Sequence, residues 1–105
     1  MLDVVLSNQF KKDLKRAKKR GLPLDELEVI VDKLAAEQPL DAQNHDHALT
    51  GNFIGFRECH IRPDWLLMYR VNDGDLILFL FRTGSHTDLF DEAFQQAAFG
   101  LSAFL

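Results

Sequence analysis

The stretch WLLMYRVNDGDLILFLF at residues 65–81 decides the fold of this chain. It holds two almost unbroken apolar runs, Trp65 to Tyr69 and Leu76 to Phe81, which a short polar segment separates. Asp-Gly within that segment is a strong hairpin signal, because these residues readily adopt the backbone angles of a tight turn. We therefore predict two adjacent antiparallel strands at the centre of a sheet.

A third strand is predicted immediately before this hairpin, at residues 56–62. Side chains alternate along a strand, so one of its faces is polar and carries Glu58, His60 and Arg62. The preceding residues 40–50 are polar and irregular, and they predict a loop that delivers His45 and His47 to the sheet edge.

The N-terminal third predicts a strand followed by two helices. Residues 2–6 are short and β-branched, and residues 8–20 then place apolar side chains at helical spacing before Gly21. A second helix fits between Pro23 and Pro39. The order β-α-α-β-β-β predicts an α+β fold in which two N-terminal helices pack on an antiparallel sheet.

Length and composition predict one domain over residues 1–105. A chain of 105 residues that is 47% hydrophobic can close one core. Residues 91–105 form a C-terminal extension whose apolar positions predict a helix. The sequence has no apolar run that would span a membrane and no signal peptide, and its single cysteine, Cys59, excludes an internal disulfide. We therefore expect a cytoplasmic protein without a membrane partner.

The net charge of -4 conceals an uneven distribution of charge. Residues 1–20 hold seven Lys and Arg against two Asp, whereas residues 21–56 hold one Lys against seven acids. The overall acidity argues against a protein that grips nucleic acid over a wide surface. The basic face of the first helix favours either a phosphate or acidic partner, or simply a solvated helix surface.

Polar side chains suited to RNA cleavage lie at the ends of the predicted strands: His47, His60, Asp64, Arg82 and His86. When the 2′-hydroxyl attacks its own phosphodiester, that hydroxyl must lose a proton and the leaving 5′-oxygen must gain one. Imidazoles can do both near neutral pH without a metal. Arg82 and Arg70 are candidates to hold the phosphate, and Trp65 and Phe90 are candidates to stack on bases.

Other functions fit some of the same residues. Each histidine, aromatic or arginine taken singly is compatible with an ordinary structural role. The pairs His45-x-His47, His60-x3-Asp64 and His86-x-Asp88 supply nitrogen and oxygen ligands for a metal such as zinc. None of these spacings matches an established zinc signature, so a metal-dependent hydrolase stays an alternative.

Three motifs together resemble one family. The segments His47-x-Leu49-x-Gly51-x3-Gly55-x-Arg57, His60-x3-Asp64-Trp65-x3-Tyr69 and Arg82-Thr83-Gly84-Ser85-His86-x2-Leu89-Phe90 look like the YafQ branch of the RelE-type bacterial toxins, over about residues 1–90. The resemblance implies an α+β RelE-like fold. It also implies a ribosome-dependent endoribonuclease, or mRNA interferase, of a type II toxin-antitoxin pair, which cuts mRNA at the ribosomal A site without a metal or other cofactor.

The resemblance assigns roles to the matching positions. His47, His60, Asp64 and His86 resemble the acid-base residues, with His86 as general acid and Asp64 or His60 as base. Arg82 resembles the phosphate-stabilising arginine, and Trp65 and Phe90 the aromatics that bind RNA. Arg57 and Arg70 occupy matching strand positions to which no catalytic role is assigned. The implied partners are a DinJ-like ribbon-helix-helix antitoxin, mRNA on the ribosome, and operator DNA only through the antitoxin complex.

This chain departs from the family pattern in its extension and in its acidity. Asp88, Asp91 and Glu92 crowd His86 in the sequence, and carboxylates beside the site would repel an approaching phosphate. The departures leave a second reading open, in which a catalytically weak or inactive homologue serves as an antitoxin-bound transcriptional corepressor.

Overall fold

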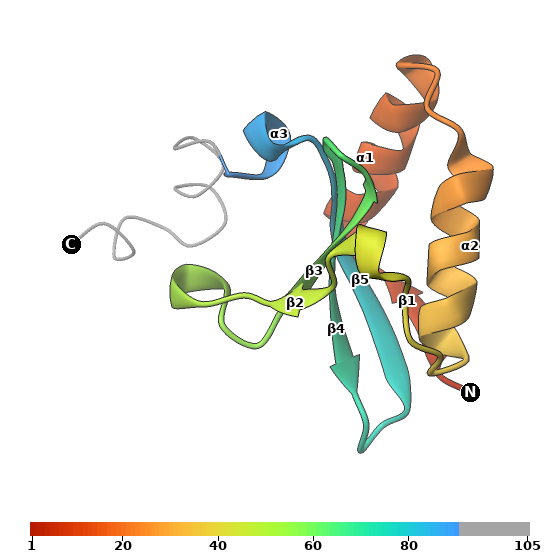
Figure 1. The fold of residues 1–105 in the computed structure, drawn as a ribbon, viewed down its shortest axis with the longest axis vertical. Coiled ribbons are helices and arrows are strands. Elements are labelled where there is room, and N and C mark those ends of the chain that lie inside the picture. The colour runs from red at the N-terminus through yellow and green to blue at the C-terminus, as the bar shows by residue number, and fades with distance from the viewer. Residues whose placement is uncertain (91–105) are drawn as a thin grey trace.

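A five-stranded sheet with two helices on one face makes up most of residues 1–90, which the computed structural model describes (Figure 1). The strands are β1 (Asp3–Leu6), β2 (His47–Ala48), β3 (Arg57–Arg62), β4 (Trp65–Asn72) and β5 (Ile77–Gly84). The α-helices are α1 (Asn8–Lys19), α2 (Leu24–Ala35) and α3 (His86–Phe90), and two short 3-10 helices are η1 (Ala42–Asn44) and η2 (Gly51–Phe53). The helix predicted at 91–105 lies outside the described residues.

The sheet has the order β1-β5-β4-β3-β2 and confirms the predicted hairpin. Strands β4 and β5 pair antiparallel across the Asp-Gly turn, and β3 pairs antiparallel with β4. The predicted α+β fold with two N-terminal helices is confirmed. The sheet is mixed, because β1 runs parallel to β5, with Asp3 opposite Ile77 and Leu6 opposite Leu80, while its other pairs are antiparallel. Strands β1 and β5 are far apart in sequence, and the packing of the intervening helices sets their direction.

Helices α1 and α2 cover one face of the sheet, as Figure 1 shows. The core between these layers consists mainly of Leu2, Phe10, Ala17, Leu27, Ile30, Leu34, Cys59, Trp65, Leu67, Tyr69, Leu78 and Leu80. Each large apolar side chain buried there stabilises the fold by about 1.5–3 kcal/mol. A smaller cluster, Phe53, Leu66, Met68 and Leu89, lies apart from this core. No helix within residues 1–90 is long and apolar enough to span a bilayer.

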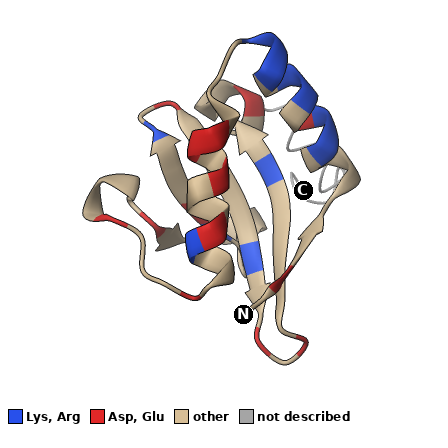
Figure 2. Ribbon diagram, turned by 90° about the vertical axis from the view of Figure 1, so that its right-hand side faces the viewer, with Lys and Arg blue, Asp and Glu red and all other residues tan. Residues whose placement is uncertain are grey.

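Helix α1 begins and ends where the sequence predicts. The Ser7 hydroxyl accepts the Phe10 N–H at 2.9 Å and donates to the Phe81 carbonyl at 2.7 Å, so the cap also fastens α1 to β5. Gly21, with a φ of 75°, follows the last turn in the left-handed conformation that glycine favours. Figure 2 shows Lys and Arg gathered along α1, and mainly Asp and Glu along α2.

A buried ion pair joins α1 to the end of β5. The Asp13 carboxylate accepts hydrogen bonds from Arg82 Nε at 2.7 Å, from Arg82 Nη2 at 3.1 Å and from the Thr83 N–H at 3.1 Å. The side chains of Asp13 and Arg82 are only 1% and 5% exposed. The Arg82 guanidinium is therefore paired with a buried carboxylate in this structure, and its role at the substrate phosphate stays a prediction.

Replacing Asp13 with alanine should lower the free energy of unfolding by about 3–5 kcal/mol, because the buried charge of Arg82 loses the carboxylate that compensates it. Urea denaturation followed by circular dichroism measures this loss. Asp3→Ala, which removes an exposed carboxylate, is the control and should change stability by less than about 0.5 kcal/mol. A loss for Asp13→Ala as small as the control's would contradict the role of the pair.

Candidate active site

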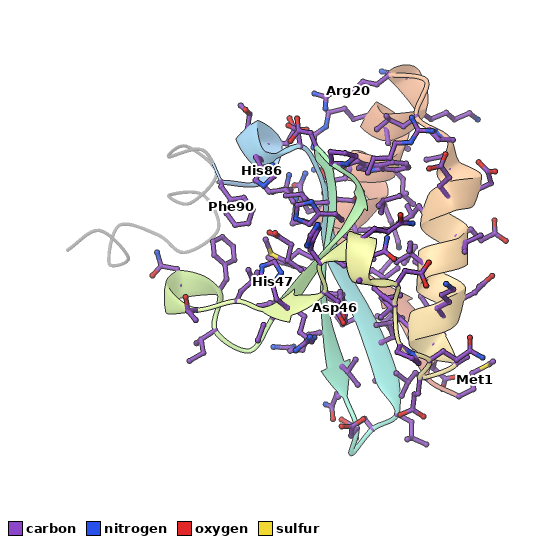
Figure 3. The ribbon with its side chains drawn as sticks, in the orientation of Figure 1. Met1, Arg20, Asp46, His47, His86 and Phe90 are labelled. Atoms are coloured by element: carbon purple, nitrogen blue, oxygen red, sulfur yellow. The ribbon has the colours of Figure 1, made fainter. Side chains whose placement is uncertain are left out.

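Three histidines from three separate elements converge on one side of the sheet. His47 lies in β2, His60 in β3 and His86 at the start of α3. Figure 3 shows His47 and His86 on the side of the sheet away from α1 and α2. The ring centroids of His60 and His86 are 5.8 Å apart. The structure thus brings these imidazoles together, whereas the Arg82 guanidinium pairs with Asp13.

The carboxylate of Glu58 lies at the centre of this cluster. Its Oε1 atom is 3.7 Å from His47 Nε2 and 3.8 Å from His60 Nε2. Glu58 is 5% exposed, and within residues 1–90 its Oε2 atom has no hydrogen-bond partner. A buried carboxylate oxygen without a hydrogen-bond partner costs folding free energy. A site that retains such an oxygen is therefore a strong functional candidate. Sequence reasoning placed Glu58 on the face of His60 but did not select it.

Asp64 holds His86 in place. The Asp64 Oδ1 atom is 2.9 Å from His86 Nδ1 and accepts the His86 backbone N–H at 3.1 Å. These hydrogen bonds, that of the backbone first, lower the pKa of the Asp64 carboxyl. Because a carboxylate only accepts, Nδ1 of His86 carries the proton, and Nε2 is the nitrogen left for chemistry.

Asp88 is held by Arg16 of α1 and by Arg20, the residue that caps the C-terminus of this helix. Its carboxylate accepts from Arg20 Nη1 at 2.6 Å and from the Ser85 N–H at 2.9 Å, and Arg16 lies 3.6 Å away. A Cβ on Gly84 would come within 2.9 Å of the Asp88 side chain, so glycine permits this close approach. The arginines therefore compensate the charge that the sequence placed next to His86, while Asp91 and Glu92 lie outside the described residues.

The loop before β2 is fastened to the sheet beside His47. The Tyr69 hydroxyl donates to Asp46 Oδ1 at 2.5 Å, and Arg57 Nε donates to the same oxygen at 3.3 Å. Burial and the hydrogen bond to Asp46 raise the pKa of Tyr69, which keeps the phenol protonated. The Nδ1 atom of His47 is 2.6 Å from the His45 carbonyl, to which it must donate. Its Nε2 atom therefore faces Glu58.

The predicted aromatic and cationic residues Trp65, Phe90 and Arg70 lie in different parts of the structure. Trp65 is 2% exposed and donates from Nε1 to Thr83 Oγ1 at 3.0 Å, so it packs in the core here, and its predicted contact with RNA stays a prediction. Phe90 lies at the site, with its ring centroid 6.3 Å from that of His86. The Arg70 guanidinium rests over the Phe56 ring at 5.1 Å and has no contact with the histidines in any described interaction.

A metal ion could also be held here. The ligand atoms of Glu58, His60 and His86 all lie within 4.8 Å of one another. Two imidazoles and a carboxylate suit zinc or copper, and the Glu58 oxygen without a partner fits a ligand role. The geometry of the described residues thus permits two uses of one cluster, proton transfer and metal binding.

Comparison with known proteins identifies relatives along nearly the whole described chain. Residues 2–91 match the model of the family described as "Bacterial toxin of type II toxin-antitoxin system, YafQ". The mRNA interferase toxin YafQ of Escherichia coli strain K12 is 38% identical over 89 residues, which cover 84% of this chain and 95% of that protein.

Solved structures agree with these sequence matches. A metal-bound toxin from Helicobacter pylori is 47% identical, with a TM-score of 0.82 over 86% of this chain and 100% of that one. A chain of the Escherichia coli DinJ-YafQ complex is 37% identical, with a TM-score of 0.79 over 87% of this chain and 100% of that one. The matched residues 2–91 include the positions of His47, His60 and His86.

Replacing Asp88 with asparagine should destabilise the protein by about 1 kcal/mol near pH 7, because the contacts of its carboxylate with Arg20 and Ser85 weaken. The hydrogen bond from Arg20, first among several contacts, lowers the pKa of Asp88 below its ordinary 3.8. Its stabilising effect is therefore complete only well above the ordinary pKa of 3.8, and it is lost as the pH falls from there through the lowered value.

Urea denaturation of both proteins between pH 7 and pH 2 tests this assignment. The difference in stability between wild type and Asp88→Asn should shrink at the acid end of the range. The exposed Asp32→Asn on α2 serves as a matched control with no expected difference at any pH. A difference between wild type and Asp88→Asn that persists undiminished at pH 2 would exclude an electrostatic origin.

Proposed function

The chain belongs to the YafQ family of bacterial type II toxins, and on this premise we propose that it is a ribosome-dependent mRNA endonuclease. The proposed reaction is attack of the 2′-hydroxyl on the adjacent phosphodiester at the ribosomal A site, without a metal. One observation carries the proposal: His47, His60 and His86 gather around the buried Glu58 carboxylate. The three histidines come from three separate elements, β2, β3 and α3.

His86 is proposed as the general acid. Asp64 holds its Nδ1 side at 2.9 Å, which orients the ring and leaves Nε2 to protonate the leaving 5′-oxygen. The sequence left Asp64 or His60 as the base. Because its hydrogen bonds to His86 lower the pKa of Asp64, that carboxylate is a weak base, and we assign the base to His60.

Glu58 and His47 are proposed to stabilise the charges that develop during the reaction. When His60 takes the proton of the 2′-hydroxyl it becomes a cation, and the Glu58 carboxylate 3.8 Å away stabilises that cation. Because the Arg82 guanidinium is paired with Asp13, we propose that protonated imidazoles, that of His47 among them, stabilise the negative charge of the phosphorane. Phe90, whose ring lies near His86, is proposed to contact a base of the substrate.

The remaining parts of the proposal concern partners. The relative in the DinJ-YafQ complex is paired with an antitoxin, and we propose a DinJ-like antitoxin for this chain. The Lys and Arg residues of α1 supply a positive surface suited to ribosomal RNA phosphates (Figure 2). Operator DNA is proposed to bind only the complex, and the working compartment is proposed to be the cytoplasm.

The alternative of an inactive corepressor loses part of its basis. It rested on carboxylates crowding His86, yet Asp88 is bound by Arg20 and neighbours Arg16. A substrate phosphate would therefore meet a compensated charge at this position. Expression of the chain alone distinguishes the two functions, since a corepressor without nuclease activity would not arrest growth.

Replacing either His60 or His86 with alanine should slow mRNA cleavage by about 10²–10⁴-fold, the typical contribution of one acid or base. Primer extension on a translated message measures the rate, and an untranslated copy of the same message should stay intact. Thr87→Ala, at the exposed neighbour of His86 in α3, is the matched control and should retain full activity. Full activity of His86→Ala would refute its assignment as the general acid.

Chelation should leave cleavage intact, because the proposed proton transfers need only imidazoles. Excess zinc should slow it, because an ion held by Glu58, His60 and His86 would occupy the nitrogen lone pairs that the acid and base use. When bound, such an ion would supply Lewis-acid chemistry instead. Cleavage assayed with EDTA and with added zinc distinguishes these cases, and loss of activity with EDTA would favour the metal-dependent hydrolase.

A further inference from the structure

A pocket adjoins the histidine cluster, and His60 is one of its lining residues. It lies between η1 and the end of β3 and has a volume of about 460 Å³. Its walls include Gln43, Asn44, His45, His60, Arg62 and Pro63. Pockets of about 300–1,000 Å³ commonly hold small organic groups, so this hollow has room for a nucleotide. His60 contributes to both the hollow and the histidine cluster.

His45 is held in a strained conformation at the wall of this pocket. Its φ of 47° and ψ of 45° place it in the left-handed region, which costs energy for a residue other than glycine. The His45 ring meets the His60 ring edge-on, with centroids 5.4 Å apart. Strained residues persist where the surroundings fix them, and they concentrate at functional sites.

The turn that carries His45 is anchored on both sides. The buried Asn44 donates from Nδ2 to the His60 carbonyl at 2.8 Å, and His47 Nδ1 donates to the His45 carbonyl at 2.6 Å. Asp46 is bound by Tyr69. These contacts place His45 rigidly against β3 and leave its exposed ring to face the pocket, rather than to pack in the core.

The remaining walls suit a flat, uncharged group better than a phosphate. Glu26 binds Arg62 through two hydrogen bonds of 3.0 and 2.6 Å, which fix the guanidinium plane and offset its charge. The amide of Gln43 is exposed and makes no hydrogen bond to any residue of the described part of the chain. An amide offers both a donor and an acceptor, which is what the edge of a base requires.

We propose that this pocket receives a nucleobase of the nucleotide next to the scissile phosphodiester, and that Gln43 and His45 select that base. The inference rests on the proposed nuclease function. It adds that the protein recognises a base next to the phosphodiester that is cleaved. Imidazole and guanidinium planes stack on unpaired bases, and the Gln43 amide reads the base edge. If the scissile phosphate binds between His60 and His86, the base of the neighbouring nucleotide comes to lie next to His60, which lines the pocket.

Mapping of cleavage sites tests the proposal. Messages containing all four bases at each position around the cut are cleaved by the wild type, Gln43→Ala and His45→Gly, and the ends are sequenced. The preference at one position flanking the cut should change by about threefold to tenfold in each variant, since one hydrogen bond or stacking contact is lost. His45→Gly removes the ring while glycine tolerates the left-handed backbone, so the variant should stay folded.

Gln38→Ala provides the matched control, because Gln38 is exposed and lies outside this pocket. It should cut at the wild-type sites with the wild-type preference. If the wild type cleaves but both pocket variants keep its preference, the pocket assignment is overturned and the nuclease function stands. If the wild type cleaves no message, the proposed function fails, and the base-selecting role fails with it.

Discussion

The buried pair of Asp13 and Arg82 ties the helical layer of this protein to the strand that leads into its site. Asp13 accepts hydrogen bonds from Arg82 and from the Thr83 N–H, so one carboxylate fixes both α1 and the last residues of β5. Helix α3 begins two residues beyond that strand. The direction in which His86 leaves the sheet therefore depends on an ion pair in the protein interior.

The same helix positions the site a second time through its surface charges. Arg20 binds Asp88, and Asp88 also accepts the Ser85 N–H, so the first turn of α3 is held on both sides. Arg16 reaches both Asp13 and Asp88. Basic residues of α1 and its C-cap thus do more than present a positive surface, because Arg16 and Arg20 both contact Asp88 close to His86. This use of charge is compatible with an overall acidic chain.

Two neighbouring features lie on the side of the sheet that carries the histidines. The histidine cluster surrounds the Glu58 carboxylate, and the pocket that His60 lines has walls made from a rigid turn and from an arginine already paired with Glu26. His60 thus belongs both to the histidine cluster and to the wall of the pocket. In the proposed function, a small protein would place the reacting phosphate and a neighbouring base side by side at this one imidazole.

The sequence by itself determined the features that depend on residues close together in the chain. These are the Asp-Gly hairpin, the helix between Ser7 and Gly21, and the histidines in or next to strands. The reason is that periodicity and turn chemistry act between near neighbours. Only the tertiary structure decided the parallel pairing of β1, the burial of Arg82 and Trp65, and the central position of Glu58. The spacing of a motif shows which residue types the sequence offers to a site. It cannot report whether a guanidinium meets solvent or a buried carboxylate, because a residue 69 positions away supplies that partner.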